Sequence, residues 1–299
     1  MTGELARHLP WWTKLGAKLL LARLPLPYHA WRKIGVFRHG AMLDTDYALH
    51  VFDYHFRHAR PAWTAGRTVL ELGPGDSLAT AMLARTHGAA RTWLVDRAAY
   101  ATPRLESYRA LAERLNASPS SDRPAVPPPA SLEAMLEWSG GRYLVDGLAS
   151  LSVIPDDSVD LSFSHAVLEH VRRHEFDATI QELFRVAAPG GLTSHRIDLR
   201  DHLGMNLHNL RFSRQWWESP FVASSGFYTN RLRVTQIIDS FRHAGFEILS
   251  TRETRWPALP LPRRKLDPEF AAMPDGELTV QGFDLIARKP EQPARGRAS

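Results

Sequence analysis

From about residue 66 to residue 290 the chain repeats one pattern, a short apolar segment followed by a helical one. This alternation is typical of an α/β protein with a mainly parallel sheet. Seven strands are predicted: "RTVLELG", "RTWLVD", "RYLVDG", "VDLSFSH", "GLTSHRIDL", "FEILSTRE" and "FDLIARK". Helical segments separate the first five, whereas a proline-rich stretch joins the last two, so these two are expected to pair as antiparallel strands. The predicted fold is a doubly wound, seven-stranded, mainly parallel sheet with an antiparallel last strand.

The pattern also divides the chain into segments. Residues 1–65 are expected to form an N-terminal helical, basic cap, and residues 66–290 the main domain. Within that domain, residues 116–131 are rich in proline and serine and are interpreted as an insertion, and residues 255–278 as an inserted loop. Residues 291–299 have the composition of a disordered tail.

The composition excludes several kinds of site. With 44% hydrophobic residues in 299, the chain can bury a core. No uncharged apolar run is long enough to span a bilayer, and no secretory signal is recognised, so a cytoplasmic protein is expected. The absence of cysteine excludes disulfides, thiolate metal sites and cysteine nucleophiles.

Positive charge is concentrated near the N-terminus. The net charge is +5, and basic residues there alternate with Trp and Leu: Lys14, Lys18, Arg23, Arg32, Lys33 and Arg38. Such a segment favours either peripheral membrane contact through residues 1–34 or a helical cap whose apolar stripe covers the main domain. The second interpretation is preferred, because Trp and Leu at helical spacing are usually packing residues.

The first predicted strand ends in a glycine turn, "VLELGPGDS". Gly73 and Gly75 allow the backbone to approach a ligand closely, and a helix is expected to begin near Asp76 or Ser77. Leu78 occupies the position where a dinucleotide-binding fingerprint has its third glycine, which argues against a pyrophosphate ligand. Glu71 and Asp76 add negative charge, which favours a cationic ligand or one rich in hydroxyl and amino donors.

The order Glu71-Leu72-Gly73-Pro74-Gly75 resembles the first motif of the class I S-adenosylmethionine-dependent methyltransferases, of the methyltransferase type 11 kind. The second strand ends in Asp96, where an acid accepts hydrogen bonds from both ribose hydroxyls. The segments "IPDDSVDLSFSHAVLEHV" and "LFRVAAPGG" resemble the family's fourth-strand region and the turn before its fifth strand. Together these features cover roughly residues 66–200.

The resemblance implies a Rossmann-like methyltransferase fold, enzymatic methyl transfer and S-adenosylmethionine as the cofactor. It also implies that Asp146 accepts from the adenine amino group, that the amide of Gly147 meets the ring, and that two residues at the end of the fourth strand line the cofactor. The cofactor-binding residues expected on this basis are Glu71, Gly73, Gly75, Asp76, Asp96, Asp146, Gly147, Ser164 and His165.

The acceptor is expected beyond the carboxyl ends of the fourth and fifth strands, where ligands of parallel sheets bind. Transfer to a hydroxyl needs positioning and a base, and histidine titrates in the right range. His202 or His195 is therefore the candidate base, steered by Asp198 or Asp201. Because side chains alternate along a strand, His195 and Asp198 point to opposite faces of the sheet and cannot both line one site.

Other residues of this region leave alternatives open. Asp198, Asp201 and Asn206 could bind Mg²⁺, but their spacing is not distinctive and no metal site is predicted. His170 is interpreted as a packing or orienting residue. A further set would suit a polar, anionic or sugar-like acceptor: Arg211, Trp216, Tyr228, Asn230 and Arg231.

The expected function is methyl transfer to a small-molecule or glycan acceptor, with oxygen the favoured atom. The alternatives are a nucleic-acid or protein methyltransferase, or a non-catalytic binding or scaffold protein that retains the fold. Nucleic acid is disfavoured as a partner because the fourth strand ends in "SHAV", unlike the amino-directed nucleic-acid enzymes. The sequence indicates no oligomeric state.

Overall fold

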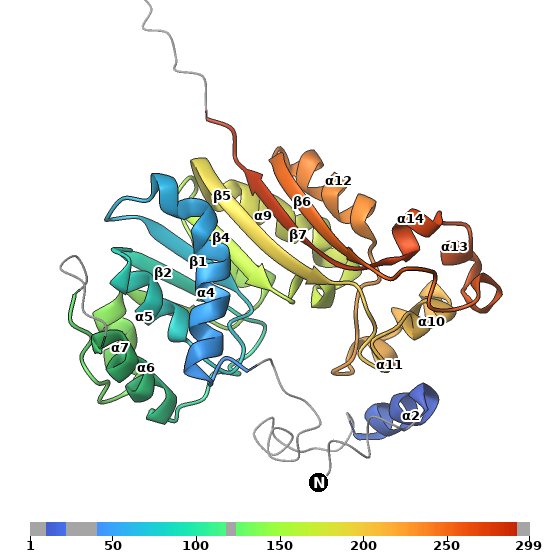
Figure 1. Ribbon diagram of the computed structural model, residues 1–299, viewed down its shortest axis with the longest axis horizontal. Coiled ribbons are helices and arrows are strands. Elements are labelled where there is room, and N and C mark those ends of the chain that lie inside the picture. The colour runs from blue at the N-terminus through green and yellow to red at the C-terminus, as the bar shows by residue number, and fades with distance from the viewer. Residues whose placement is uncertain (1–9, 22–40, 118–123, 292–299) are drawn as a thin grey trace, which may run out of the picture.

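The computed structural model describes residues 10–21, 41–117 and 124–291. Seven strands form one sheet in the order β3-β2-β1-β4-β5-β7-β6 (Figure 1). Strands β1 to β5 pair in parallel, and β7 runs antiparallel to both β5 and β6. The bounds are Thr68–Leu72 (β1), Arg91–Val95 (β2), Gly141–Leu144 (β3), Val159–His165 (β4), Ala187–Asp198 (β5), Glu247–Arg255 (β6) and Val280–Arg288 (β7). The predicted sheet, with its antiparallel last strand, is confirmed.

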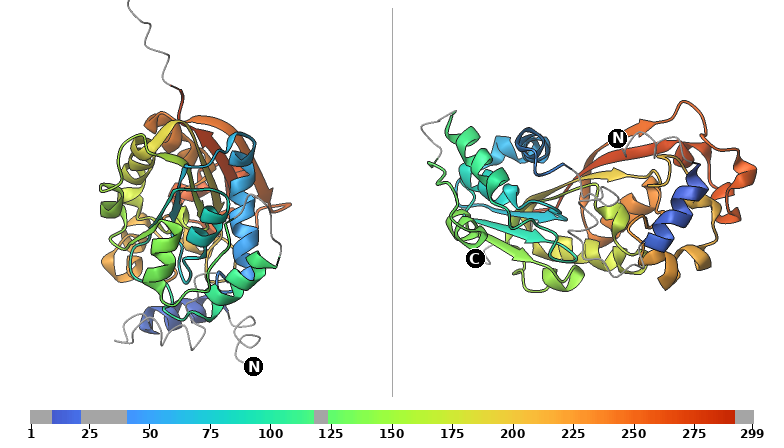
Figure 2. Two further views of the ribbon diagram at one scale, coloured as in Figure 1. Left: turned by 90° about the vertical axis from the view of Figure 1, so that its left-hand side faces the viewer. Right: turned by 90° about the horizontal axis from the view of Figure 1, so that it is seen from below.

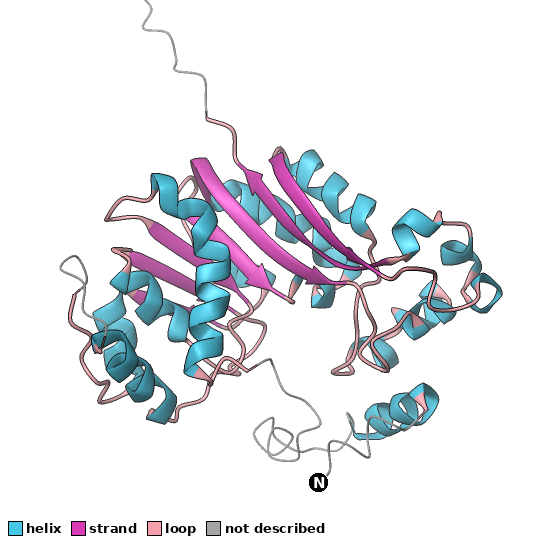
Figure 3. Ribbon diagram, viewed as in Figure 1, coloured by secondary structure: helices cyan, strands magenta, loops and turns pink. Residues whose placement is uncertain are grey.

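Helices cover both faces of the sheet (Figures 2 and 3). On one face lie α4 (Thr45–Ala59), α5 (Ala79–Thr86), α6 (Glu106–Asn116) and α7 (Leu132–Ser139). On the other lie α8 (Leu148–Leu151), α9 (Phe176–Val186) and α12 (Val234–Ala244). Two apolar cores result, since successive residues of a strand face opposite layers. In β1, Val69 belongs to the first core and Leu70 to the second, and neither is exposed.

The helix after the glycine turn begins later than expected. It starts at Ala79 rather than near Asp76 or Ser77, and Leu78 is fully buried in the core beneath α4. A bulky leucine therefore packs where a dinucleotide fingerprint would have glycine, so the close helix–strand approach of that fingerprint is absent at this turn.

Short elements beyond the sheet form a small lobe at one end of the molecule (Figure 1). They are η4 (His208–Arg211), α10 (Arg214–Trp217), α11 (Pro220–Ala223), η5 (Arg263–Lys265), α13 (Pro268–Ala271) and α14 (Asp275–Leu278). The loop expected at 255–278 supplies η5, α13 and α14, and Phe270 packs with Leu207 and Leu210 in one apolar cluster. This loop is part of the lobe's core.

Helix α2 (Trp11–Leu21) lies against the same lobe. Leu15 packs with Trp217 and Phe227, and the ring of Trp11 stacks on His208 with 4.7 Å between centroids. This packing agrees with the preferred interpretation of the N-terminal segment as a cap. Most of the stretch considered for membrane contact, residues 1–34, lies outside the described residues.

Two other expectations concern the insertion and the tail. The described part of the insertion packs on the domain: Val126 is buried, and its backbone exchanges two hydrogen bonds with the Asn116 side chain. Residues 118–123 and 292–299 lie outside the described residues. Throughout the described ranges, no helix is long and apolar enough to cross a bilayer.

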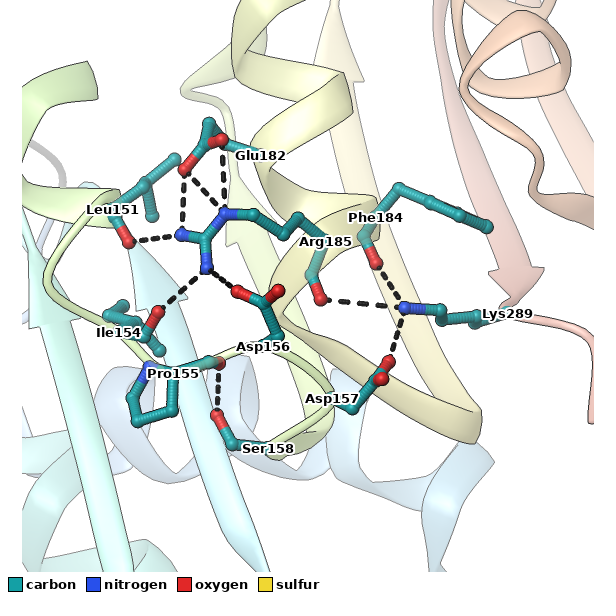
Figure 4. A network of polar contacts seen from close by, with 10 residues as sticks. All are labelled: Leu151, Ile154, Pro155, Asp156, Asp157, Ser158, Glu182, Phe184, Arg185 and Lys289. Atoms are coloured by element: carbon teal, nitrogen blue, oxygen red, sulfur yellow. Dashed lines mark hydrogen bonds and ion pairs between the residues drawn. The ribbon is translucent and has the colours of Figure 1, made fainter. Parts of the chain in front are cut away.

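A network of polar contacts, here called the polar clamp, lies at the end of the sheet where β4 begins (Figure 4). Arg185 of α9 bonds through all three side-chain nitrogens, to Glu182 and Asp156 and to two carbonyls of the preceding loop. Lys289 donates to Asp157 at 2.6 Å and to the carbonyl of Phe184 at 2.9 Å. These bonds fix the loop before β4 to α9 and to the end of β7.

Candidate active site

The glycine turn after β1 lies against the carboxyl end of β2. Gly73 and Gly75 have left-handed backbone, with φ of +71° and +64°, which other residues rarely adopt. The amide of Gly73 donates to the carbonyl of Val95 (2.8 Å), and that of Gly75 to Asp96 Oδ2 (3.0 Å). Asp96 Oδ1 accepts from the amide of Arg97 (2.7 Å). The Asp96 carboxylate thus ties the glycine turn to the end of the second strand.

The turn after β3 joins the same edge. The amide of Gly147 donates to the carbonyl of Asp96 (2.9 Å), and Gly147 has φ of +56°. Asp146 is exposed, and its amide donates to Ser150 Oγ (2.9 Å). Residues expected to bind the cofactor from three different strands are therefore adjacent, as the carboxyl ends of parallel strands require.

Two acids flank the glycine turn from inside the protein. Glu71 is 3% exposed, and its Oε2 has no hydrogen-bond partner. Burial raises the pKa of Glu71 to about 8, and the nearby charge of Asp96 adds to the shift. Asp76 is also buried, and its carbonyl accepts from the amide of Thr102 (2.9 Å).

The segment after β4 touches the glycine turn from the other side. A Cβ added to Gly73 would lie 2.4 Å from Val167 Cγ2, so glycine is required for this close approach. Ala166, just before it, has φ of +55°, a backbone conformation uncommon for residues other than glycine and asparagine. Val167 therefore packs on the turn, although the sequence did not single it out.

The end of β4 carries Ser164 and His165. Ser164 Oγ lies 2.7 Å from His195 Nδ1, and the side chain is fully buried on the α12 side of the sheet. Ser164 as a cofactor-lining residue stays a prediction, and its hydroxyl is engaged with His195. His165 points to the opposite face, where its Nδ1 lies 3.2 Å from His55 Nε2 of α4. Burial, together with the charge of Arg196, lowers the pKa of His165 to about 4.

His195, the other candidate base, lies between the sheet and α12. It is 1% exposed, and its ring nitrogens contact Ser164 Oγ and Thr193 Oγ1. Its ring also packs against Phe241 of α12, and burial lowers its pKa to about 3. The alternation along β5 was correctly predicted, but the face that carries His195 is covered by a helix.

The two aspartates after β5 are engaged in local bonds. Asp198 pairs with Arg200 through Oδ1 (2.9 Å) and Oδ2 (2.7 Å). Its partial burial would raise the pKa, but the bonds from Arg200 outweigh burial and the pKa of Asp198 is lowered. Asp201 accepts from the amides of Leu203, Gly204 and His208. Neither carboxylate is hydrogen-bonded to His202, so the expected steering contact is absent.

His202 is paired instead with His170. His170 Nδ1 lies 2.8 Å from the carbonyl oxygen of Tyr228, and because a carbonyl only accepts, this nitrogen carries the hydrogen. Neutral His170 then has its lone pair on Nε2, 3.2 Å from His202 Nε2, which must donate. The lone pair of neutral His202 is therefore on Nδ1. Burial, with a smaller contribution from His170, lowers the pKa of His202 to about 3, which keeps the ring neutral.

The residues considered for a sugar-like acceptor mostly hold the lobe together. Asn230 donates to the carbonyls of Leu168 and Val171, and the hydroxyl of Tyr228 donates to Glu218 (2.7 Å). Arg211 lies over the ring of Trp11, 4.6 Å from its centroid, and Trp216 stacks on Phe212. Arg231, by contrast, has unpaired nitrogens.

Helix α4 contributes residues that the sequence analysis did not name. His55 is fully buried between Ser194 Oγ (2.8 Å) and His165, and Tyr54 donates to Asp284 of β7. The sequence did contain a signal for this helix, because Asp44 caps a 15-residue segment with an apolar stripe. No cluster of three or more potential metal ligands occurs in the described ranges.

Comparison with known proteins agrees with this geometry. Residues 129–194, from before β3 into β5, match the family model described as a methyltransferase domain. No curated protein matches the chain.

Several solved structures are similar to this chain at low identity. One is a chain from the complex of the Haloferax volcanii Trm112 methyltransferase activator with a methyltransferase, at 18% identity, TM-score 0.42, covering 84% of this chain and 97% of that one. A methyltransferase from Methanosarcina mazei has 17% identity and a TM-score of 0.45, with 79% and 98% covered. The [4+2]-cyclase SpnF has 17% identity and a TM-score of 0.46, with 81% of each chain covered. These similarities say nothing about the acceptor.

The matched residues include Gly147, which donates to the carbonyl of Asp96, and Val167, which packs on Gly73; the sheet has the order 3-2-1-4-5-7-6 with β7 antiparallel. Residues 129–194 of this chain are therefore similar to a methyltransferase domain.

Proposed function

We propose that the protein methylates a hydroxyl oxygen of a small-molecule or saccharide-like acceptor, with the cofactor held at the carboxyl ends of β1, β2 and β3. The observation that carries the cofactor site is the junction at Asp96. This carboxylate sits where the glycine turn and the ends of β2 and β3 meet. Ligands of parallel sheets bind at this edge.

The residues at this edge fit the chemistry of the donor. Gly73 and Gly75 leave the turn without side chains, so the backbone can lie close to a ligand. The buried, unpartnered Oε2 of Glu71 offers an acceptor to a cation or an amino group. Asp96 and Asp146 supply carboxylates for hydroxyl and amino donors. The bound cofactor supplies an electrophilic methyl group on a positively charged sulfur.

Proton removal is assigned to His202. An acceptor hydroxyl that attacks a methyl carbon loses its proton, and a positioned imidazole lone pair can take it. The carbonyl of Tyr228 and the ring of His170 orient His202 with its lone pair on Nδ1. Burial lowers the pKa of His202 to about 3, so the ring is neutral near pH 7 and its Nδ1 is unprotonated.

Calorimetry with S-adenosylhomocysteine tests the cofactor site. We expect binding by the wild-type chain and a loss of about 100-fold or more in affinity for Asp96→Ala, because a carboxylate that accepts charge-assisted hydrogen bonds is removed. Asp239→Ala is the matched control, since Asp239 lies on the outer surface of α12. Equal affinities for Asp96→Ala and the wild type would disprove the proposed site.

A labelled-methyl transfer screen over hydroxylated small molecules and saccharides tests the reaction. With an acceptor found in this way, His202→Asn should lower kcat by roughly 10²–10⁴ and leave the affinity for S-adenosylhomocysteine unchanged. His202 should also cause no loss of activity between pH 7 and pH 5, since its pKa is about 3. Unchanged kcat in His202→Asn would remove it as the base.

A further inference from the structure

A small polar cavity lies beyond the carboxyl ends of β4 and β5. Its volume is about 10 Å³, room for about one water-sized group. It adjoins η2 (Leu168–His170), the turn that follows Val167 and its contact with Gly73. The lining residues are Glu169, Asp198, Leu199, Asn209, Thr229, Asn230, Arg231 and Leu232.

Two lining residues carry acceptor oxygens without a donor. Glu169 is 2% exposed; its Oε1 accepts from the amide of Asp198 (3.2 Å), but its Oε2 has no partner. Asn209 is 1% exposed; its amide donates to Thr229 Oγ1 (3.0 Å), but its Oδ1 has no partner. Leaving a buried polar atom unpaired costs about 1–3 kcal/mol, so both oxygens indicate a missing hydrogen-bond partner.

A third lining residue carries donors without an acceptor. Arg231 is 3% exposed, and its Nε and Nη2 have no partner. These two nitrogens form one complete edge of the guanidinium fork. The remaining nitrogen, Nη1, donates to the carbonyl of Phe212 (2.6 Å), and the group lies 5.3 Å from the ring of Trp217 and 5.0 Å from that of Phe270. The unpaired edge is therefore held in place.

Backbone geometry supports a special role for this arginine. Arg231 has φ of +61°, a strained conformation for a residue with a side chain, and such strain clusters at ligand sites. Arg233, two residues later and 1% exposed, has ordinary backbone and donates from every side-chain nitrogen to a carbonyl. Unpaired nitrogens are thus peculiar to Arg231 in this segment.

The combination of unpaired oxygens and unpaired N–H groups indicates which kind of ligand fits the cavity. An anion would pair with Arg231 and leave Asn209 Oδ1 unpaired, and it would lie near the Glu218 carboxylate, whose charge acts on Arg231. A cation would pair with the oxygens and leave the Arg231 edge unpaired. A hydroxyl donates and accepts, and it pairs with Glu169 whether that carboxyl is protonated or ionised.

We propose that this cavity is a subsite for a hydroxyl group of a neutral, polyhydroxylated acceptor, bound by Glu169, Asn209 and Arg231. The proposal rests on the proposed function and names its substrate class. The space for one water-sized group means that a single hydroxyl enters and replaces a water molecule, while the rest of the acceptor lies outside the cavity.

Three sugars with the same ring test the charge preference. D-glucose, D-glucosamine and D-glucuronate are added separately to the full chain saturated with S-adenosylhomocysteine, and binding is measured by saturation-transfer NMR. Glucose should bind up to about tenfold more tightly than either charged sugar, because each of these replaces one hydroxyl of glucose, at carbon 2 or at carbon 6, with a charged group that pairs with only one kind of unpaired atom. Tighter binding of glucuronate or glucosamine would overturn the proposal.

Two variants test the assigned residues. Arg231→Lys keeps the charge but loses the fork, and Glu169→Met keeps the length but removes both oxygens. Each should lower glucose affinity about tenfold or more and leave S-adenosylhomocysteine affinity within about twofold; Arg214→Lys, an exposed arginine in the same lobe, should change neither. Wild-type glucose affinity in both variants overturns the proposal. A wild-type chain that binds S-adenosylhomocysteine but no sugar also overturns the subsite and leaves the cofactor site intact.

Discussion

The two ends of the parallel strands differ in how completely their buried and half-buried polar side chains are hydrogen-bonded. Each end is called an edge below. At the edge where β4 begins, Arg185 and Lys289 bond through every side-chain nitrogen, and their partners are loop carbonyls and nearby acids (Figure 4). At the opposite edge, Arg231 leaves two nitrogens unpaired, and Glu169 leaves one oxygen unpaired. Both networks join several elements, but only the first is complete.

The difference follows from what each edge does. A complete network lowers the free energy of the folded chain by itself, whereas an incomplete one is costly unless another molecule completes it. The carboxyl ends of parallel strands are where ligands bind, and the unpaired Glu71 oxygen lies at this edge too. The unpaired atoms of Glu71, Glu169 and Arg231 all lie at this edge, here called the functional edge, where a bound ligand would pair with them.

The largest predicted effect is a difference in unfolding free energy between variants of two arginines at the functional edge, Arg233 and Arg231. Arg233→Met should lower the free energy of unfolding by about 3–5 kcal/mol, because the carbonyls of Leu199, Glu277 and Val280 lose their donor. Arg231→Met should cost about 2 kcal/mol less, since fewer bonds are broken and two unpaired nitrogens disappear. Urea unfolding of both variants measures the difference. Equal losses of unfolding free energy would show that the two unpaired nitrogens of Arg231 do not destabilise the folded chain.

The fold was predictable because buried parallel strands appear in sequence as apolar runs between helical segments. "RTVLELG" and "RTWLVD" are such runs, and the proline-rich stretch before the last strand correctly predicted an antiparallel pair. Helix α4 was assigned to an N-terminal cap, yet Phe52 and Phe56 pack in the core of the sheet's first face. The amphipathic pattern of this helix predicts that its apolar stripe is buried, but it does not indicate which part of the protein covers that stripe.

The candidate site was predictable only where it depends on strand ends. Asp96 and Gly147 are neighbours because parallel strands end at one edge, a relation that follows from topology. The surroundings of His195 and Ser164 were not predictable, because alternation gives two faces of a strand without saying which one a helix covers. Glu169 and Asn209 were missed because their partners come from segments distant in sequence, and pairing of that kind is visible only in three dimensions.

A second effect should depend on pH. Burial raises the pKa of Glu169 from 4.5 to about 8, so between these values the folded chain keeps a proton that the unfolded chain has lost. Stability is therefore lost as pH rises from about 4.5 to 8 and is constant above. Glu169→Gln removes this term, so its advantage in unfolding free energy over the wild type should grow from pH 5 to pH 8, on the order of 2–4 kcal/mol. A difference that is constant over this range would contradict the burial of an unpaired carboxyl.

The smallest effect belongs to the complete network. Lys289→Met should lower the free energy of unfolding by about 1–2 kcal/mol, because the carbonyl of Phe184 loses its donor while the aliphatic part of the side chain can still pack on the Phe184 ring. Affinity for S-adenosylhomocysteine should be unchanged, since the clamp lies at the edge away from the glycine turn. Thermal unfolding and calorimetry on the same variant give both values. A loss of cofactor affinity here would show that the two edges are coupled, and that complete pairing at one edge helps to position the unpaired groups at the other.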